Sequence, residues 1–102
     1  MVARRQQRYY TYRVDFSWDE TKARSNLAKH GVSFEEAVTV FADPLALVVE
    51  DVGDAERMIL VGKSMSGRLL LTIFIEKDNE RIRIISARRA TSHERRRYEE
   101  GI

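Results

Sequence analysis

The second half of this 102-residue chain contains four runs of strand-forming residues that are separated by only a few residues each. Turn formers such as Gly53, Gly67 and Asn79 stand in the gaps. Gaps this short favour antiparallel hairpins over helical crossovers. The pattern therefore predicts a four-stranded antiparallel meander made of residues 45–51, 56–64, 68–77 and 81–88.

The third run shows the clearest alternation, which predicts two unlike faces of the sheet. Successive side chains of a strand point to opposite faces, so residues two apart share a face. We expect the apolar face to pack against helices and the partly polar face to stay open to a ligand. The apolar set is Leu69, Leu71, Ile73 and Ile75, and the polar set includes Arg68, Thr72 and Glu76.

A short strand at residues 13–17 is predicted ahead of the first helix. This helix begins after Asp19, an N-cap residue, and ends at Gly31, which supplies a left-handed C-cap. Ala23, Leu27 and His30 are spaced to form its apolar face.

Two further helices are marked by capping boxes. Ser33 and Glu36 open the second helix, which ends at Asp43-Pro44 because proline cannot continue the hydrogen-bond ladder. Thr91 and Glu94 open a charged C-terminal helix.

Amphipathic helices need an apolar surface, and one face of the meander supplies it. The expected fold is therefore α+β with two layers: a short N-terminal strand, two helices packed on a four-stranded antiparallel meander, and a C-terminal helix. Residues 13–102 would form a single domain, since a chain of this length buries one core. Residues 1–12 are basic and aromatic without a clear period, which predicts a flexible tail or an extended start.

Positive charge is concentrated at both ends of the chain, although the net charge is only +2. Residues 1–14 contain four arginines and no acidic residue, and residues 81–102 contain seven arginines against three glutamates. The middle is therefore acidic overall. Such segregation can create a local positive potential that attracts a polyanion. The alternative is that both basic segments are simply solvated.

The composition excludes several classes of site. The chain has no cysteine, which rules out disulfides and thiolate zinc sites, and two histidines alone rarely hold a metal tightly. We therefore expect no cofactor, no metal site and a reducing, cytoplasmic setting. No run approaches the length of a membrane span and the basic N-terminus is unlike a secretory signal, so no membrane association is expected.

A set of short blocks carries a family resemblance: Phe16-Ser17-Trp18-Asp19, Lys22, the run from Asn26 to Ala37, Val40-Phe41, Asp43-Pro44 and the run from Ile82 to Thr91. In this order and spacing the blocks resemble the BrnT toxin family, over about residues 16–100. The resemblance implies a fold similar to that of RelE ribonuclease toxins and an RNA-cleaving activity. It also implies neutralisation by a BrnA-type antitoxin with a ribbon-helix-helix domain, in a heterotetramer that contacts operator DNA only through the antitoxin.

Cleaving RNA without a metal ion requires a group that takes the 2′-hydroxyl proton, cations that stabilise charge on the phosphate, and an acid for the departing 5′-oxygen. Arg88 and Arg89, at the end of the last predicted strand, are the first candidates because guanidinium forks suit phosphate oxygens. Arg57 and His30 are the other catalytic candidates. The structural alternatives are ion pairs with glutamates for Arg88 and Arg89, and a helix-end role for His30.

RNA-binding residues are predicted among the remaining cations and one aromatic residue. Trp18 is able to stack on a base but also suits the core. Arg68 is able to share a cationic pocket with Arg57. Arg81 and Arg83 form a basic stripe that equally fits a solvated sheet face. The full predicted set is Trp18, Lys22, Lys29, Arg68, Arg81 and Arg83.

The C-terminal helix presents Arg95, Arg96 and Tyr98, which we predict to contact the acidic part of an antitoxin. The alternatives are a solvated helix with Tyr98 as its packing anchor and a surface that contacts RNA. The predicted function is thus a metal-independent endoribonuclease toxin that cuts RNA by attack of the 2′-hydroxyl. A non-catalytic RNA-binding or co-repressor module would use the same basic face without turnover, and a structural adaptor would need only the fold and the charged last helix.

Overall fold

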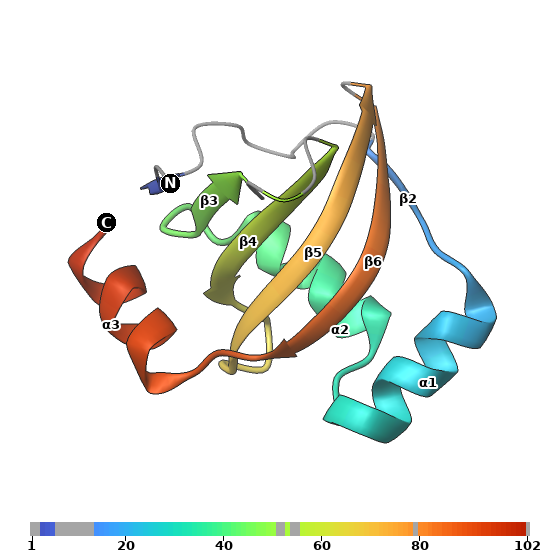
Figure 1. The fold of residues 1–102 in the computed structure, drawn as a ribbon, viewed down its shortest axis with the longest axis horizontal. Coiled ribbons are helices and arrows are strands. Elements are labelled where there is room, and N and C mark those ends of the chain that lie inside the picture. The colour runs from blue at the N-terminus through green and yellow to red at the C-terminus, as the bar shows by residue number, and fades with distance from the viewer. Residues whose placement is uncertain (1–2, 6–13, 51–52, 54–55, 79, 102) are drawn as a thin grey trace.

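A computed structural model describes residues 3–5, 14–50, 53, 56–78 and 80–101 of the chain. Within these ranges, six strands form one mixed sheet in the order β1-β3-β4-β5-β6-β2 (Figure 1). The strands are β1 (Ala3–Arg5), β2 (Asp15–Ser17), β3 (Leu47–Glu50), β4 (Arg57–Lys63), β5 (Leu69–Asp78) and β6 (Arg81–Arg89). The helices are α1 (Glu20–His30), α2 (Phe34–Thr39), the 3₁₀ helix η1 (Val40–Ala42) and α3 (Ser92–Glu100).

The strands from β3 to β6 form the predicted antiparallel meander. The sheet has one strand more than the expected five, because β1 pairs with β3 while the predicted N-terminal strand, β2, pairs parallel with β6. Residues 3–5 of the predicted tail thus take the extended form, and this pairing satisfies backbone groups that the edge of β3 would otherwise leave open. Residues 1–2 and 6–12 of that tail lie outside the described part of the chain. The similarity to RelE toxins stays a prediction.

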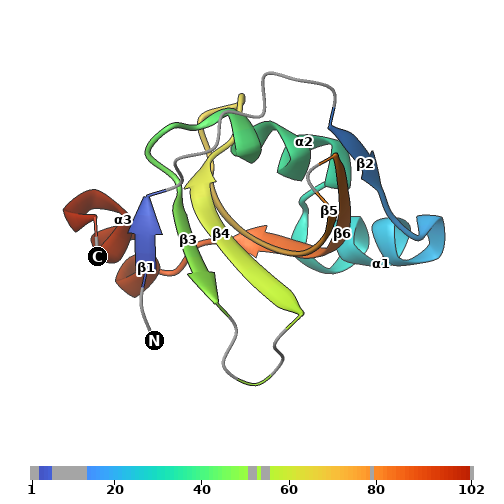
Figure 2. The same ribbon diagram turned by 90° about the horizontal axis from the view of Figure 1, so that it is seen from above.

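The main core lies between α2 and the face of the sheet that α2 covers, which we call the inner face. β5 and β6 curve around α2, and α1 lies along β6 (Figure 2). The rings of Phe41 and Phe74 meet edge to face with centroids 4.9 Å apart. The buried strand residues of this core are Leu60, Leu70, Phe74, Ile82, Ile84 and Ala87, and the buried helix residues are Phe34, Ala37, Val40 and Phe41.

The helices α1 and α2 cover the face of the sheet opposite to the one predicted. Leu70 and Phe74 of β5 point into the core beneath α2, whereas Leu69 and Leu71 pack with Tyr98 of α3 on the outer face. The predicted alternation holds, but both sets of β5 residues contain apolar side chains. The two-residue period alone therefore could not decide which set faces α2. The outer face is apolar where α3 covers it and is not the open polar surface that we expected.

Thr72 is a buried polar residue whose hydroxyl has no hydrogen-bond partner among the described residues. We expect Thr72→Val to raise the free energy of unfolding by about 1 kcal/mol, because valine keeps the shape and removes the cost of burying a hydroxyl group. Urea denaturation measures this change. Thr39→Val is the matched control and should destabilise the protein, since the Thr39 hydroxyl donates to the Glu36 carbonyl and accepts from the Met65 N–H. A loss of stability in Thr72→Val would contradict the expectation.

α1 begins and ends as predicted. The Asp19 side chain accepts a hydrogen bond from the Lys22 N–H at 3.0 Å, and Gly31 ends the helix with a φ of 69° in the left-handed region, which favours glycine. The predicted apolar face is wrong, however, because Leu27 is 51% exposed and His30 is exposed too.

The buried residue of α1 is Asn26, which binds the free edge of β6. Its amide nitrogen donates to the carbonyl oxygens of Ala87 at 2.8 Å and Val32 at 3.0 Å, and its amide oxygen accepts from the Ala87 N–H at 3.1 Å. β2 pairs with β6 only along residues 81–83. Asn26 therefore supplies the hydrogen bonds that β6 needs beyond the end of β2.

Candidate active site

The C-terminal ends of α1 and β6 lie at the same corner of the molecule. Asn26 of α1 is bonded to Ala87 of β6, which fixes the two elements side by side. His30 follows Asn26 by four residues, on the same side of the helix, and Arg89 follows Ala87 by two residues, on the same face of the strand. His30 and Arg89 therefore lie just beyond this contact, at the adjacent C-terminal ends of α1 and β6.

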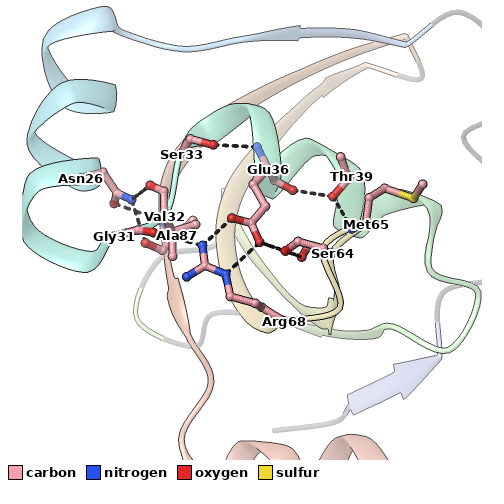
Figure 3. A network of polar contacts seen from close by, with 11 residues as sticks. Asn26, Gly31, Val32, Ser33, Glu36, Thr39, Ser64, Met65, Arg68 and Ala87 are labelled. Carbon is pink, nitrogen blue, oxygen red and sulfur yellow. Dashed lines mark hydrogen bonds and ion pairs between the residues drawn. The ribbon is translucent and has the colours of Figure 1, made fainter.

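Arg68 reaches the same corner from the turn before β5. Its Nη2 donates a hydrogen bond to the carbonyl oxygen of Gly31 at 3.0 Å, directly after His30 (Figure 3). Arg89 pairs with Leu70 in the sheet, so Arg68 and Arg89 lie on the inner face near each other. We call His30, Arg68 and Arg89 the α1–β6 corner.

Glu36 of α2 holds the Arg68 guanidinium in a two-point ion pair (Figure 3). Arg68 Nε donates to Glu36 Oε2 at 3.0 Å, and Arg68 Nη2 donates to Glu36 Oε1. The hydroxyls of Ser64 and Ser66 donate to Oε2 at 2.7 and 2.6 Å. Arg68 first, and then these two hydroxyls, lower the pKa of Glu36 from 4.5 to about 2. The Arg68 fork is thereby held in one orientation beside Gly31.

Acid is expected to weaken this network. Because folding lowers the pKa of Glu36, its ionised form contributes stability that is complete above 4.5 and is lost as the pH falls toward 2. The difference in unfolding free energy between the wild type and Glu36→Gln should therefore be constant near neutral pH and shrink between those two values. Urea denaturation across this range measures it, with the exposed Glu35→Gln as control. A difference that stays constant down to the lower value would contradict the assigned pKa.

The α1–β6 corner combines groups that can move a proton with groups that can bind phosphate. Lys29 and His30 occupy the last turn of α1, where the partial negative charge of the helix end favours cations. Their side chains are exposed, as is that of Arg89. An imidazole beside guanidinium groups can exchange protons with a substrate while the guanidinium groups hold phosphate oxygens.

Arg88 lies on the outer face, opposite to Arg89, because successive residues of a strand alternate. Its Nη1 and Nη2 donate to the two carboxylate oxygens of Glu94, both at 2.8 Å, and Nη1 also donates to the Arg89 carbonyl at 3.1 Å. This pair raises the pKa of Arg88 and lowers that of Glu94. Arg88 thus has the ion-pair partner of the structural alternative, and Arg88 and Arg89 do not form one joint phosphate site.

Arg57 and Arg83 lie on the outer face at the end of the sheet far from the corner. In the sheet register Arg57 is opposite Ile75, and Ile75 is opposite Arg83. Arg57 and Arg68 therefore lie on opposite faces and at opposite ends of the β4–β5 hairpin. The single cationic pocket predicted for Arg57 and Arg68 does not form.

Lys22, at the start of α1, and Arg83, on β6, both act on the carboxylate of Asp19. The pKa of Asp19 is lowered by the backbone N–H of Lys22 and additionally by the charges of Lys22 and Arg83, which places both cations within electrostatic range of one carboxylate. Arg81, on the same strand as Arg83, pairs with Asp78 at 2.9 Å. Lys22 and Arg83 thus both lie near Asp19, at the opposite end of α1 from the corner.

Trp18 packs in the fold rather than standing free. Its ring meets Phe34 edge to face with centroids 5.9 Å apart, and its indole N–H donates to Glu20 at 3.1 Å. These contacts agree with the core alternative, since Trp18 is half-buried against the main core.

Tyr98 anchors α3 to the sheet. Its hydroxyl donates to Asp43 at 2.7 Å, and burial together with Asp43 raises the pKa of Tyr98 to about 12. The guanidinium of Arg5 lies 5.3 Å from the centre of its ring. Tyr98 is 7% exposed, so it is not available for contact with a partner, whereas Arg95 and Arg96 are exposed.

Glu36 is the residue of this site that the sequence did not indicate. The sequence marked it only as part of a capping box, and Ser33 does cap the Glu36 N–H at 3.0 Å. Its side chain instead binds Arg68, which is 32 positions away. No pattern among neighbouring residues predicts an ion pair between Glu36 and Arg68.

The described residues contain no group of three or more histidine, cysteine, aspartate or glutamate side chains that could hold a metal ion. In the same part of the chain, no helix has the length and apolar character needed to cross a membrane.

Comparison with known proteins points to one family. The model of the ribonuclease toxin BrnT, of type II toxin–antitoxin systems, matches residues 18–94. The crystal structure of the Brucella abortus ribonuclease toxin BrnT is similar, with a TM-score of 0.64 and 28% sequence identity, and the similarity covers 76% of this chain and 97% of that chain. No curated protein matches the chain.

Proposed function

The chain belongs to the BrnT family of ribonuclease toxins of type II toxin–antitoxin systems, and we propose that it cleaves RNA internally, without a metal ion, at the α1–β6 corner. One observation carries this proposal: an exposed histidine at the end of α1 lies beside the ends of two segments that bear Arg68 and Arg89. The corner therefore combines a proton-transfer group with two phosphate-binding groups.

The proposed reaction is attack of the ribose 2′-oxygen on the neighbouring phosphorus. His30 accepts the 2′-hydroxyl proton, which makes the oxygen a better nucleophile. The new bond joins the 2′-oxygen to phosphorus, and the bond from phosphorus to the 5′-oxygen breaks. The products are a 2′,3′-cyclic phosphate and a 5′-hydroxyl end, whose proton comes from solvent.

Arg89 and Arg68 have different roles in this proposal. Arg89 is exposed and moves to the phosphate, where its charge stabilises the negative charge that builds up as the 2′-oxygen attacks. Arg68 is already oriented by Glu36 and Gly31, so it needs little reorganisation to hold a phosphate oxygen through its remaining N–H groups. Arg88 is held by Glu94 on the other face and is assigned to the fold.

We propose that the RNA backbone runs along α1 away from the corner. Lys29 lies at the corner end of the helix, and Lys22 lies at the other end, where Arg83 acts on the same carboxylate, that of Asp19. A groove or face with cations spaced along it suits a single-stranded backbone without demanding a particular sequence. Arg57 and Arg83 flank Ile75 on adjacent strands, so Arg57 would extend the contact with the RNA backbone.

The test is incubation of the purified protein with end-labelled RNA in EDTA. Cleavage that persists in EDTA, leaves cyclic phosphate ends and is lost in His30→Gln supports the proposal. Cleavage that EDTA abolishes would contradict metal independence. RNA that is retained without any new ends would support the non-catalytic RNA-binding module instead.

We further propose that the antitoxin is a BrnA-like ribbon-helix-helix protein encoded beside the toxin. It would form a heterotetramer with the toxin and would alone contact operator DNA. Mass measurement of the co-expressed complex in solution tests the stoichiometry, and operator binding by the free toxin would contradict the division of roles.

A further inference from the structure

Most of α1 is exposed, although the helix packs beside β6. Of its eleven residues, only Ala23 and Asn26 are turned inward, and the other nine are exposed. One of those nine is Leu27, which is 51% exposed. Its neighbours three residues away on the helix are Arg24 and His30.

The exposed residues of α1 are also strongly basic. They include four basic side chains, those of Lys22, Arg24, Lys29 and His30, and one acidic side chain, that of Glu20. RNA phosphates explain exposed cations but do not explain an exposed leucine among them. A protein segment with both acidic and apolar side chains matches the two features together.

We propose that Arg24, Leu27 and His30 form the docking surface for an acidic segment of the antitoxin, with an apolar side chain of that segment covering Leu27. This inference rests on the proposed function, because the surface includes His30 and adjoins Lys29. Docking there excludes RNA from the α1–β6 corner, so the antitoxin neutralises the toxin by occupying the RNA site.

Among the residues that the structure describes, the other exposed large apolar side chains fit such a partner less well. Leu45 and Met65 are 55% and 80% exposed, and both lie in turns rather than on a helix face. Leu45 lies between η1 and β3, and Met65 lies between β4 and β5. α3 carries the exposed Arg95 and Arg96, but its apolar residue Tyr98 is turned inward against Asp43. α3 therefore offers charge without an apolar contact, whereas α1 offers both.

The first experiment measures binding of the purified, co-encoded antitoxin by calorimetry. Leu27→Ser should weaken binding about tenfold or more, as loss of a central apolar contact does in interfaces. RNA cleavage by Leu27→Ser should equal that of the wild type. Met65→Ser, which changes a still more exposed apolar residue outside the proposed surface, should leave both binding and cleavage unchanged.

A charge series and hydrogen exchange separate the two candidate helices. Arg24→Glu should weaken antitoxin binding, and the double change of Arg95 and Arg96 to glutamate should not. On complex formation, amides in residues 20–30 should gain protection while those in residues 92–100 stay unchanged. The reverse pattern in either experiment overturns the docking surface, as does a wild-type protein that forms no complex with the co-encoded antitoxin.

The outcomes also distinguish this inference from the proposed function. A toxin that binds the antitoxin through α1 but never cleaves RNA would refute the nuclease proposal and leave the docking surface standing. A toxin that cleaves RNA and stays active when the antitoxin is bound would refute neutralisation by occupation of the RNA site.

Discussion

Arg89→Ala is expected to slow RNA cleavage by about a hundredfold or more, whereas Arg88→Ala is expected to change the rate far less. The first substitution removes a charge from the α1–β6 corner, and loss of one group that stabilises developing charge commonly has an effect of this size. The second removes the bidentate partner of Glu94, so we expect it to lower the free energy of unfolding by about 1–3 kcal/mol. Initial rates with labelled RNA and urea denaturation of the same preparations measure the two effects.

The adjacency of these two arginines makes them a matched pair. Both belong to the end of β6 and both changes remove one guanidinium group, but the side chains lie on opposite faces of the sheet. Arg89→Lys should recover part of the activity, because lysine restores the charge but not the planar fork. A folded Arg88→Ala protein without activity, beside an active Arg89→Ala protein, would move the site to the outer face.

Asn26→Ala is expected to lower the free energy of unfolding by about 3–5 kcal/mol, the largest stability effect that we predict. The change leaves the Ala87 N–H and the carbonyl groups of Ala87 and Val32 without their partner, and each such buried group costs about 1–3 kcal/mol. Small domains are stable by only about 5–15 kcal/mol, so this variant would lose a large part of its free energy of unfolding. Thermal and urea unfolding monitored by circular dichroism measure the loss.

Two further variants isolate the cause of that loss. Ser25→Ala changes an exposed neighbour on the same helix and should be close to neutral. Asn26→Asp keeps an acceptor for the Ala87 N–H but turns a carboxylate toward two carbonyl oxygens, so it should be at least as damaging as alanine. A nearly neutral Asn26→Ala would show that α1 is held to β6 by other contacts.

The three α-helices and the strands β2 to β6 were predictable because their signals are local. Asp19, Ser33 and Thr91 each cap a helix with the side chain that the sequence indicated, and Glu94 completes the predicted capping box. The meander was predictable for the same reason, since short turns dictate antiparallel pairing.

Part of the candidate site could also be predicted from the sequence. The residue types of His30, Arg68 and Arg89 mark each of them as a candidate, but no pattern in the sequence predicts that the three lie near one another. The alternation of a strand alone implies that the side chains of Arg88 and Arg89 face apart, which argues against one phosphate site shared by the two. Family membership indicates a ribonuclease activity, but it does not indicate that the α1–β6 corner is the site.

The sequence by itself determined the three α-helices, the strands β2 to β6, the helix caps and the order of the meander, because each of these depends on residues within a few positions of one another. Only the tertiary structure decided which face of β5 the helices cover, that Asn26 completes the edge of β6, and that Glu36 orients Arg68. Those contacts join residues 32 and 61 positions apart, and they form only when burial and unsatisfied hydrogen-bonding groups select one packing among several.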